Sequence, residues 1–236
     1  MKVFFKAVAT LAAAIVLAAG NLRTLSASAA AYTQTVDVVS SGSALNVEPT
    51  LILEADSFGK MQEIEQAAVR PASVIVTPDA DMNVSLGGES KTLAETFDGY
   101  MKGRFIPVVR LTAETVDKFA AWMKNTYTVS DIMAVSSEIE VIEKLYADEV
   151  CYIVNTVYDL TSVSIPENRY ELWQYVGEAN AAGCNILMFD GADGRISLAA
   201  EYVSSLTKVC WAYADDKTEA VAAMAAGCYG VAAPSA

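Results

Sequence analysis

Histidine is absent from all 236 residues of the chain. The side chain that most often transfers protons near neutral pH is therefore missing. Its absence excludes Ser-His-Asp and Cys-His nucleophilic sites, the His-Glu-x-x-His metalloproteases and zinc sites built from Cys and His. Acid–base chemistry in this protein would have to use carboxylates or other side chains.

Basic residues are scarce as well. Lys and Arg together number 16 against 29 Asp and Glu, which gives a formal net charge of −13. Such a surface repels nucleic-acid phosphates and anionic lipid headgroups, so nucleic acid is not an expected partner. Neither G-x-G-x-x-G nor G-x-x-x-x-G-K follows an apolar run, so nothing indicates a dinucleotide site or a P-loop.

The N-terminus has the layout of a bacterial-type secretory signal peptide. Lys2 and Lys6 precede an apolar run at residues 7–19, and the small residues Ala27-Ser28-Ala29 follow. The run is too short to span a bilayer. We therefore predict a signal peptide at residues 1–29, a secreted or cell-surface protein, and no membrane span in the mature form. An uncleaved membrane anchor is the alternative, and residues 30–49 are expected to form a flexible leader.

From residue 50 onward, short apolar segments alternate with helical segments that begin at capping residues such as Thr92 with Glu95 and Asp216 with Glu219. The expected strands are 51–55, 73–77, 105–111, 132–135, 150–157, 185–189, 209–214 and 229–233. Eight such units predict a compact α/β fold, a (β/α)8 TIM barrel over residues 50–236. An open doubly wound sheet is the rival.

The four cysteines all stand in or just before expected strands, which suits buried free thiols, although export would permit disulfides. None has C-x-x-C spacing. Cys184 and Cys228 both follow Ala-Ala-Gly, so they would approach each other or Cys151 at one end of a barrel. The pairing of these three and Cys210 cannot be read from spacing.

The segment KVCWAYADDKTEAVAAMAAGCYGVAAPS, residues 208–235, carries a resemblance to a known family. It resembles the C-terminal end of the glycerophosphodiester phosphodiesterase barrel, with matching residues at Trp211, Asp215, Gly227, Gly230 and Pro234. Residues 134–137 (Ala-Val-Ser-Ser) and 92–97 (Thr-Leu-Ala-Glu-Thr-Phe) resemble two further segments of that family. The resemblance implies a phosphoric diester hydrolase with two catalytic His and a carboxylate-bound divalent cation.

The sequence departs from every catalytic motif that the resemblance implies. Glu54-Ala55-Asp56 stands in place of His-Arg-Gly, Val76-Thr77-Pro78 in place of Glu-x-Asp, and Ser85-Leu86 in place of His-Asp, while Arg110 lies near a Lys position. The resemblance therefore implies a degenerate barrel, a pseudoenzyme with a ligand-binding or structural role. We assign no catalytic residue, and we expect Ca²⁺ or Mg²⁺ only if an active metal-dependent hydrolase remains.

Functional side chains of such barrels project from the carboxyl ends of the strands. That rule selects seven candidate residues for binding a small phosphodiester or polyol: Glu54, Asp79, Arg110, Asn155, Asp190, Trp211 and Tyr213.

Several roles stay open among these candidates. Trp211 is either a stacking platform or a core aromatic, and Arg110 pairs either with a phosphate or with a carboxylate such as Glu54. If Glu54, Asp79 and Asp190 converge, they would form a hard-metal site or a carboxylate-based hydrolase such as a glycosidase. Asp56 and Asp216 are predicted helix caps instead, and Ser57 is the alternative to Asp56.

Overall fold

The computed structural model describes residues 50–65, 73–126, 132–150 and 154–234. The predicted signal peptide, the leader and Cys151 lie outside these residues. Within them, no helix combines the length and the apolar character that crossing a membrane requires.

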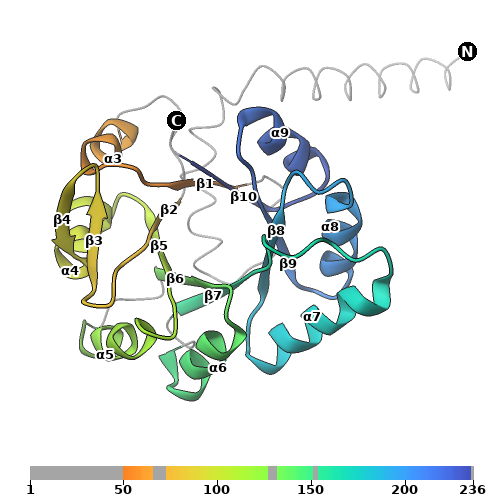
Figure 1. Ribbon diagram of the computed structural model, residues 1–236, viewed down its shortest axis with the longest axis horizontal. Coiled ribbons are helices and arrows are strands. Elements are labelled where there is room, and N and C mark those ends of the chain that lie inside the picture. The colour runs from red at the N-terminus through yellow and green to blue at the C-terminus, as the bar shows by residue number, and fades with distance from the viewer. Residues whose placement is uncertain (1–49, 66–72, 127–131, 151–153, 235–236) are drawn as a thin grey trace, which may run out of the picture.

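Eight parallel strands close into a barrel in the order β1-β10-β9-β8-β7-β6-β5-β2. Helices surround this ring of strands (Figure 1). The strands are β1 (Thr50–Glu54), β2 (Ser73–Val76), β5 (Ile106–Arg110), β6 (Ile132–Ser136), β7 (Val154–Asp159), β8 (Ile186–Asp190), β9 (Val209–Tyr213) and β10 (Gly230–Pro234). The helices between them are α3 (Phe58–Glu65), α5 (Val116–Thr126), α6 (Ile139–Ala147), α7 (Arg169–Ala181), α8 (Ile196–Ser205) and α9 (Lys217–Ala225). The predicted TIM barrel is confirmed.

A hairpin stands outside the barrel between β2 and β5, at the edge of the molecule (Figure 1). It consists of β3 (Asn83–Leu86) and β4 (Glu89–Thr92), followed by α4 (Leu93–Thr96) and a π-helical turn, η1 (Phe97–Met101). Gly87 and Gly88 form its turn with φ of +59° and +84°, a conformation that glycine adopts without strain. The capping box of Thr92 and Glu95 is confirmed, since each side chain accepts the other's backbone N–H.

The end of β7, the start of α7 and the cap of α3 differ from the prediction, whereas the bounds of the other seven strands agree to within one residue. β7 continues to Asp159, beyond the expected end at residue 157. The capping-box spacing of Ser164 and Glu167 predicts a helix start there, whereas α7 begins after Asn168, whose side chain accepts the N–H of Glu171. The segment before Asn168 is bonded to the loop before α8, because the backbone N–H of Ile165 donates to Asp193 Oδ2. α3 is capped by Ser57, whose Oγ accepts the N–H of Lys60 at 3.1 Å, rather than by Asp56.

The core has an inner part and an outer part. Alternate residues of the strands fill the barrel interior, including Ile52, Val108, Met133, Met188 and Trp211. The intervening residues pack outward against the helices. Because successive strand residues point to opposite faces, this alternation fixes which strand-end side chains lie at the barrel mouth.

Candidate functional site

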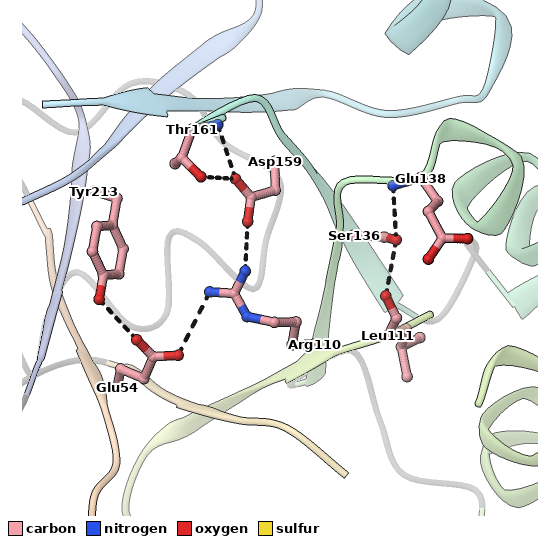
Figure 2. A network of polar contacts seen from close by, with 8 residues as sticks. All are labelled: Glu54, Arg110, Leu111, Ser136, Glu138, Asp159, Thr161 and Tyr213. Atoms are coloured by element: carbon pink, nitrogen blue, oxygen red, sulfur yellow. Dashed lines mark hydrogen bonds and ion pairs between the residues drawn. The ribbon is translucent and has the colours of Figure 1, made fainter. Parts of the chain in front are cut away.

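Four strand ends bring charged and polar side chains together at the carboxyl end of the barrel. Glu54 ends β1, Arg110 ends β5, Asp159 ends β7 and Tyr213 ends β9. Figure 2 shows the Arg110 guanidinium between the two carboxylates. Its Nη1 donates to Asp159 Oδ2 at 2.5 Å, and its Nη2 lies 3.7 Å from Glu54 Oε1. The expected pairing of Arg110 with Glu54 is confirmed, and Asp159 makes the shorter contact.

Asp159 is the buried end of this network. Its side chain is 3% exposed. Its Oδ1 accepts hydrogen bonds from the backbone N–H of Thr161 at 3.1 Å and from Thr161 Oγ1 at 2.7 Å. A buried carboxylate needs both a cation and hydrogen-bond donors, and Arg110 and Thr161 supply them.

Glu54 is the open end of the network. The side chains of Glu54 and Arg110 are 34% and 28% exposed, so both reach solvent. Tyr213 Oη donates to Glu54 Oε2 at 2.9 Å. Burial, followed by the hydrogen bond and the negative charge of Glu54, raises the pKa of Tyr213 to about 12. The phenol therefore remains a neutral donor at ordinary pH.

Ser136, at the end of β6, forms a neighbouring contact that closes the loop after β5 (Figure 2). Its buried Oγ donates to the carbonyl of Leu111 at 2.9 Å and accepts the N–H of Glu138 at 3.1 Å. Because both of these hydrogen bonds go to backbone groups, the Ser136 hydroxyl stabilises the loops after β5 and β6.

Asp79 and Asp190 are engaged by their own loops. Asp79 Oδ1 accepts the N–H groups of Asp81 and Asn83, both at 2.9 Å, and the Asn83 hydrogen bond is the main cause of the lowered pKa of Asp79. Asp190 Oδ1 accepts the N–H of Ala192 at 2.9 Å. The possible convergence of Asp79 and Asp190 with Glu54 is not seen in their hydrogen bonds, which go to backbone N–H groups of their own loops.

Two further candidate residues lie away from the barrel mouth. Asn155 stands near the start of β7, in register with Met133, because the strand runs on to Asp159. Trp211 is buried in the barrel interior, where its indole lies against Gly230. Of the two roles considered for Trp211, its burial agrees with that of a core aromatic.

Asp159 was missed because the strand was predicted to end at residue 157. A signal was present in the sequence: Asp159 is the first charged residue after the apolar run of β7. The same rule placed Glu54 and Arg110 at the strand ends where the structure has them.

The divalent cation that the resemblance implies needs several oxygen ligands around one point. Across the described ranges, no three Cys, Asp or Glu side chains gather in such a group. The carboxylates of Glu54 and Asp159 are bridged by a guanidinium instead. These residues do not fit the metal site of a hydrolase.

No known family model matches the sequence, and no curated protein sequence matches it. Solved structures do match. A glycerophosphodiester phosphodiesterase of Galdieria sulphuraria, named as putative, aligns with a TM-score of 0.61 over 80% of this chain and 95% of its own, at 9% identity. Another so named, from Agrobacterium tumefaciens, aligns with a TM-score of 0.59 over 79% and 93%, at 10% identity.

A phosphodiesterase of Oleispira antarctica, solved in complex with the product sn-glycerol-3-phosphate, aligns with a TM-score of 0.53 over 79% and 93%, at 13% identity. The TM-scores establish a common fold, and identities this low leave the activity open. The chain therefore has the (β/α)8 barrel fold of the glycerophosphodiester phosphodiesterases.

Proposed function

We propose that this protein is a secreted barrel of the glycerophosphodiester phosphodiesterase type that does not hydrolyse its ligand. In this proposal the mouth of the barrel binds a small phosphodiester or polyol. The observation that carries it is the bridge from Glu54 through Arg110 to Asp159, which uses the strand-end carboxylates as partners of a cation.

The loss of hydrolysis follows from the groups that the chain lacks. No histidine is present to move a proton, and a single positioned acid or base typically contributes about 10²–10⁴-fold to a rate. Glu54, at the strand-one position of the family, already accepts a hydrogen bond from Tyr213 and faces Arg110. Both carboxylate oxygens of Glu54 therefore already have a partner, Oε2 in Tyr213 and Oε1 in Arg110.

Ligand binding is supported by the part of the network that reaches solvent. Glu54 accepts hydrogen bonds, the Arg110 guanidinium donates them, and both are exposed by about a third of their side chains. Polyol hydroxyls both donate and accept, so they complement this pair, and a phosphodiester oxygen would accept from Arg110. The carboxyl end of the strands is also where ligands bind in this fold.

The hydrolytic half of the proposal is tested with purified mature protein and glycerophosphodiesters, with and without Ca²⁺ or Mg²⁺. We expect no turnover above that of Glu54→Gln, a variant that keeps the side-chain shape and removes the charge. Metal-dependent turnover well above this control would establish an active phosphoric diester hydrolase instead.

The binding half is tested by calorimetry with sn-glycerol-3-phosphate, glycerol and a glycerophosphodiester. Tyr213→Phe removes the donor that orients Glu54, so we expect affinity to fall about 10-fold, the value of one hydrogen bond to a charged group. Tyr229→Phe is the matched control, because Tyr229 precedes β10 at the opposite end of the barrel. Equal losses in both variants, or no binding to the wild type, would reject the site.

Secretion rests on residues 1–29 of the sequence. Expression with the native leader should release a protein whose N-terminal sequence starts after Ala29. Retention of residues 1–29 in the membrane fraction would favour the uncleaved anchor.

A further inference from the structure

Two cysteines lie beside each other between the barrel and its outer helices. Cys210 is on β9 and Cys228 is in the turn between α9 and β10. Their Sγ atoms are 4.0 Å apart, and the residues are 1% and 2% exposed. The sequence suggested that Cys228 would approach Cys184 or Cys151 and left the pairing open. Cys184 is buried with its Sγ donating to the carbonyl of Thr156 at 3.1 Å.

We infer that Cys210 and Cys228 form a disulfide bond when the protein is exported. The bond requires the sulfur atoms to approach by about 2 Å, from their present contact to the S–S bond length of about 2.05 Å. The Sγ atoms are already in contact, and rotation about the two Cα–Cβ bonds is the motion that would bring them closer.

The backbones that carry the two cysteines are fixed relative to each other. The N–H of Tyr229 donates to the carbonyl of Cys210 at 2.8 Å, so the chain next to Cys228 is bonded directly to Cys210. The N–H of Cys228 donates to Ala223 at 3.1 Å, which ties it to the end of α9. Gly227, with φ of +98°, forms the turn between these bonds. The disulfide would join two segments that are neighbours without it.

Formation of the bond is a two-electron oxidation, and a thiol:disulfide oxidoreductase with an active-site disulfide is the chemical class of oxidant that balances it. The thiolate of one cysteine attacks that disulfide, forms a mixed disulfide and releases one thiolate of the enzyme. The second cysteine then attacks the mixed disulfide, forms the Cys210–Cys228 bond and releases the enzyme as a dithiol. The two protons of the substrate thiols are lost to solvent or to the enzyme.

Burial decides when this reaction takes place. In the folded protein, the contact with Cys228 and then burial raise the pKa of the Cys210 thiol well above its usual value. A thiolate is the reactive species, so exchange in the folded state is slow. The bond would form while the chain folds outside the cytoplasm, and the packed barrel would then protect it from reductants.

The bond would close a loop that contains the whole of α9. Such a closure restricts the unfolded chain and leaves the native contacts as they are. It would also anchor β9, the strand that places Tyr213 against Glu54, to the start of β10. The inference rests on the export part of the proposed function and is independent of the ligand.

The test is peptide mapping of protein exported with its own leader and alkylated without reduction. Trypsin cleaves after Lys208 and Lys217, so residues 209–217 and 218–236 each carry one of the two cysteines. We expect these two peptides linked, with a mass about 2 Da below their sum, and separate after reduction. Both peptides alkylated as free thiols, or either cysteine linked to Cys151 or Cys184, would overturn the inference.

A second measurement does not depend on export. Denatured, reduced protein is refolded in a mixture of oxidised and reduced glutathione, and the same two peptides are mapped. We expect the link to form in the wild type and in Cys184→Ala. Reduction should lower the Tm of the linked protein by about 5–10 °C, from the usual effect of a loop of this size. An unlinked refolded wild type would overturn the inference, even if the protein is exported and binds its ligand.

Discussion

Arg110 is the residue on which the strand-end network depends, because it is the cation that Glu54 and Asp159 share. Arg110→Ala would leave the buried carboxylate of Asp159 without a charge partner. Removing one member of a buried pair is strongly destabilising, so we expect the free energy of unfolding to fall by about 3 kcal/mol. Urea unfolding of the variant and the wild type measures this difference.

Lys102→Ala is the matched control for the loss of a cation. Lys102 pairs with Asp98 on the surface, at 3.4 Å, and such pairs contribute about 1 kcal/mol or less. A double variant, Arg110→Ala with Asp159→Ala, should lose less than the sum of the two single variants, since the uncompensated carboxylate is removed. If Arg110→Ala costs no more than Lys102→Ala, the network does not support the fold.

Tyr213 makes the stability of the folded protein depend on pH in the alkaline range. Its folded-state pKa is raised to about 12 from the usual value of 10. A raised pKa means that the neutral phenol stabilises the fold fully below pH 10, and that this contribution is lost as pH rises towards 12. The stability difference between the wild type and Tyr213→Phe should therefore shrink over this pH range.

Glu54→Gln separates the two causes of the raised pKa of Tyr213. Burial is the larger cause, and the hydrogen bond to Glu54 and its charge follow. Titration of tyrosinate absorbance should show an earlier ionisation of Tyr213 in Glu54→Gln than in the wild type, with the pKa still above 10 because burial remains. An unchanged midpoint would mean that Glu54 does not face the phenol.

At the residue scale, sequence reasoning succeeded where a side chain follows directly from strand position. Glu54, Arg110 and Tyr213 end their strands and meet at the barrel mouth. One error, in the predicted end of β7, affected two residues. Asn155 was expected near the carboxyl end of the strand and lies near its start, and Asp159, which does end the strand, was not selected. The local hydrogen bonds of Asp79 and Asp190 depend on loop conformation, which the spacing of residues does not specify.

At the scale of elements, the start of α3 distinguishes two neighbouring candidates for the helix cap. Ser57 Oγ accepts the N–H of Lys60, whereas Asp56 is exposed just before it. Ser57→Ala should lower the free energy of unfolding by about 1 kcal/mol, the usual value of an N-cap. Asp56→Ala, the control, should change it by less than about 0.5 kcal/mol. Thermal unfolding of both variants decides, and the reverse order would make Asp56 the cap.

The hairpin β3–β4 is the element that the sequence did not predict. β4 (Glu-Ser-Lys-Thr) is mostly exposed and has no apolar residue, and β3 (Asn-Val-Ser-Leu) alternates polar and apolar residues over only four positions, which is too short to identify a strand. Its position depends on contacts distant in the sequence, such as Lys91 Nζ lying 4.8 Å from the ring centroid of Phe58. Gly87-Gly88 is a turn signal in the sequence, yet a turn alone does not reveal the two strands around it.

At the scale of the molecule, the barrel followed from eight repeats of an apolar strand and a capped helix, because that alternation leaves few arrangements of a parallel sheet. Closure depends on details that the pattern does not contain. Where β9 and β10 meet, Gly230 is in register with Trp211. The Trp211 indole occupies the space beside Gly230 that a side chain at position 230 would otherwise need.

Gly230→Ala should therefore disturb the closure of the barrel. A Cβ at this position would lie 2.5 Å from Trp211 Nε1, so the buried indole has to move. Overpacking of this kind costs about 1–3 kcal/mol, which urea unfolding should detect. Gly177→Ala is the control: nothing lies within 4 Å of the new Cβ, and alanine favours the helix, so stability should rise by up to about 1 kcal/mol.

A substitution of Trp211 tests whether its indole is the cause of the destabilisation by Gly230→Ala. Trp211→Leu alone creates a cavity in the barrel interior and should destabilise the protein by about 3 kcal/mol. Combined with Gly230→Ala, it removes the atoms that the new methyl group meets, so the double variant should be more stable than the sum of the single effects predicts. Strict additivity would mean that the indole and Gly230 are not in contact, and that another feature closes the barrel between β9 and β10.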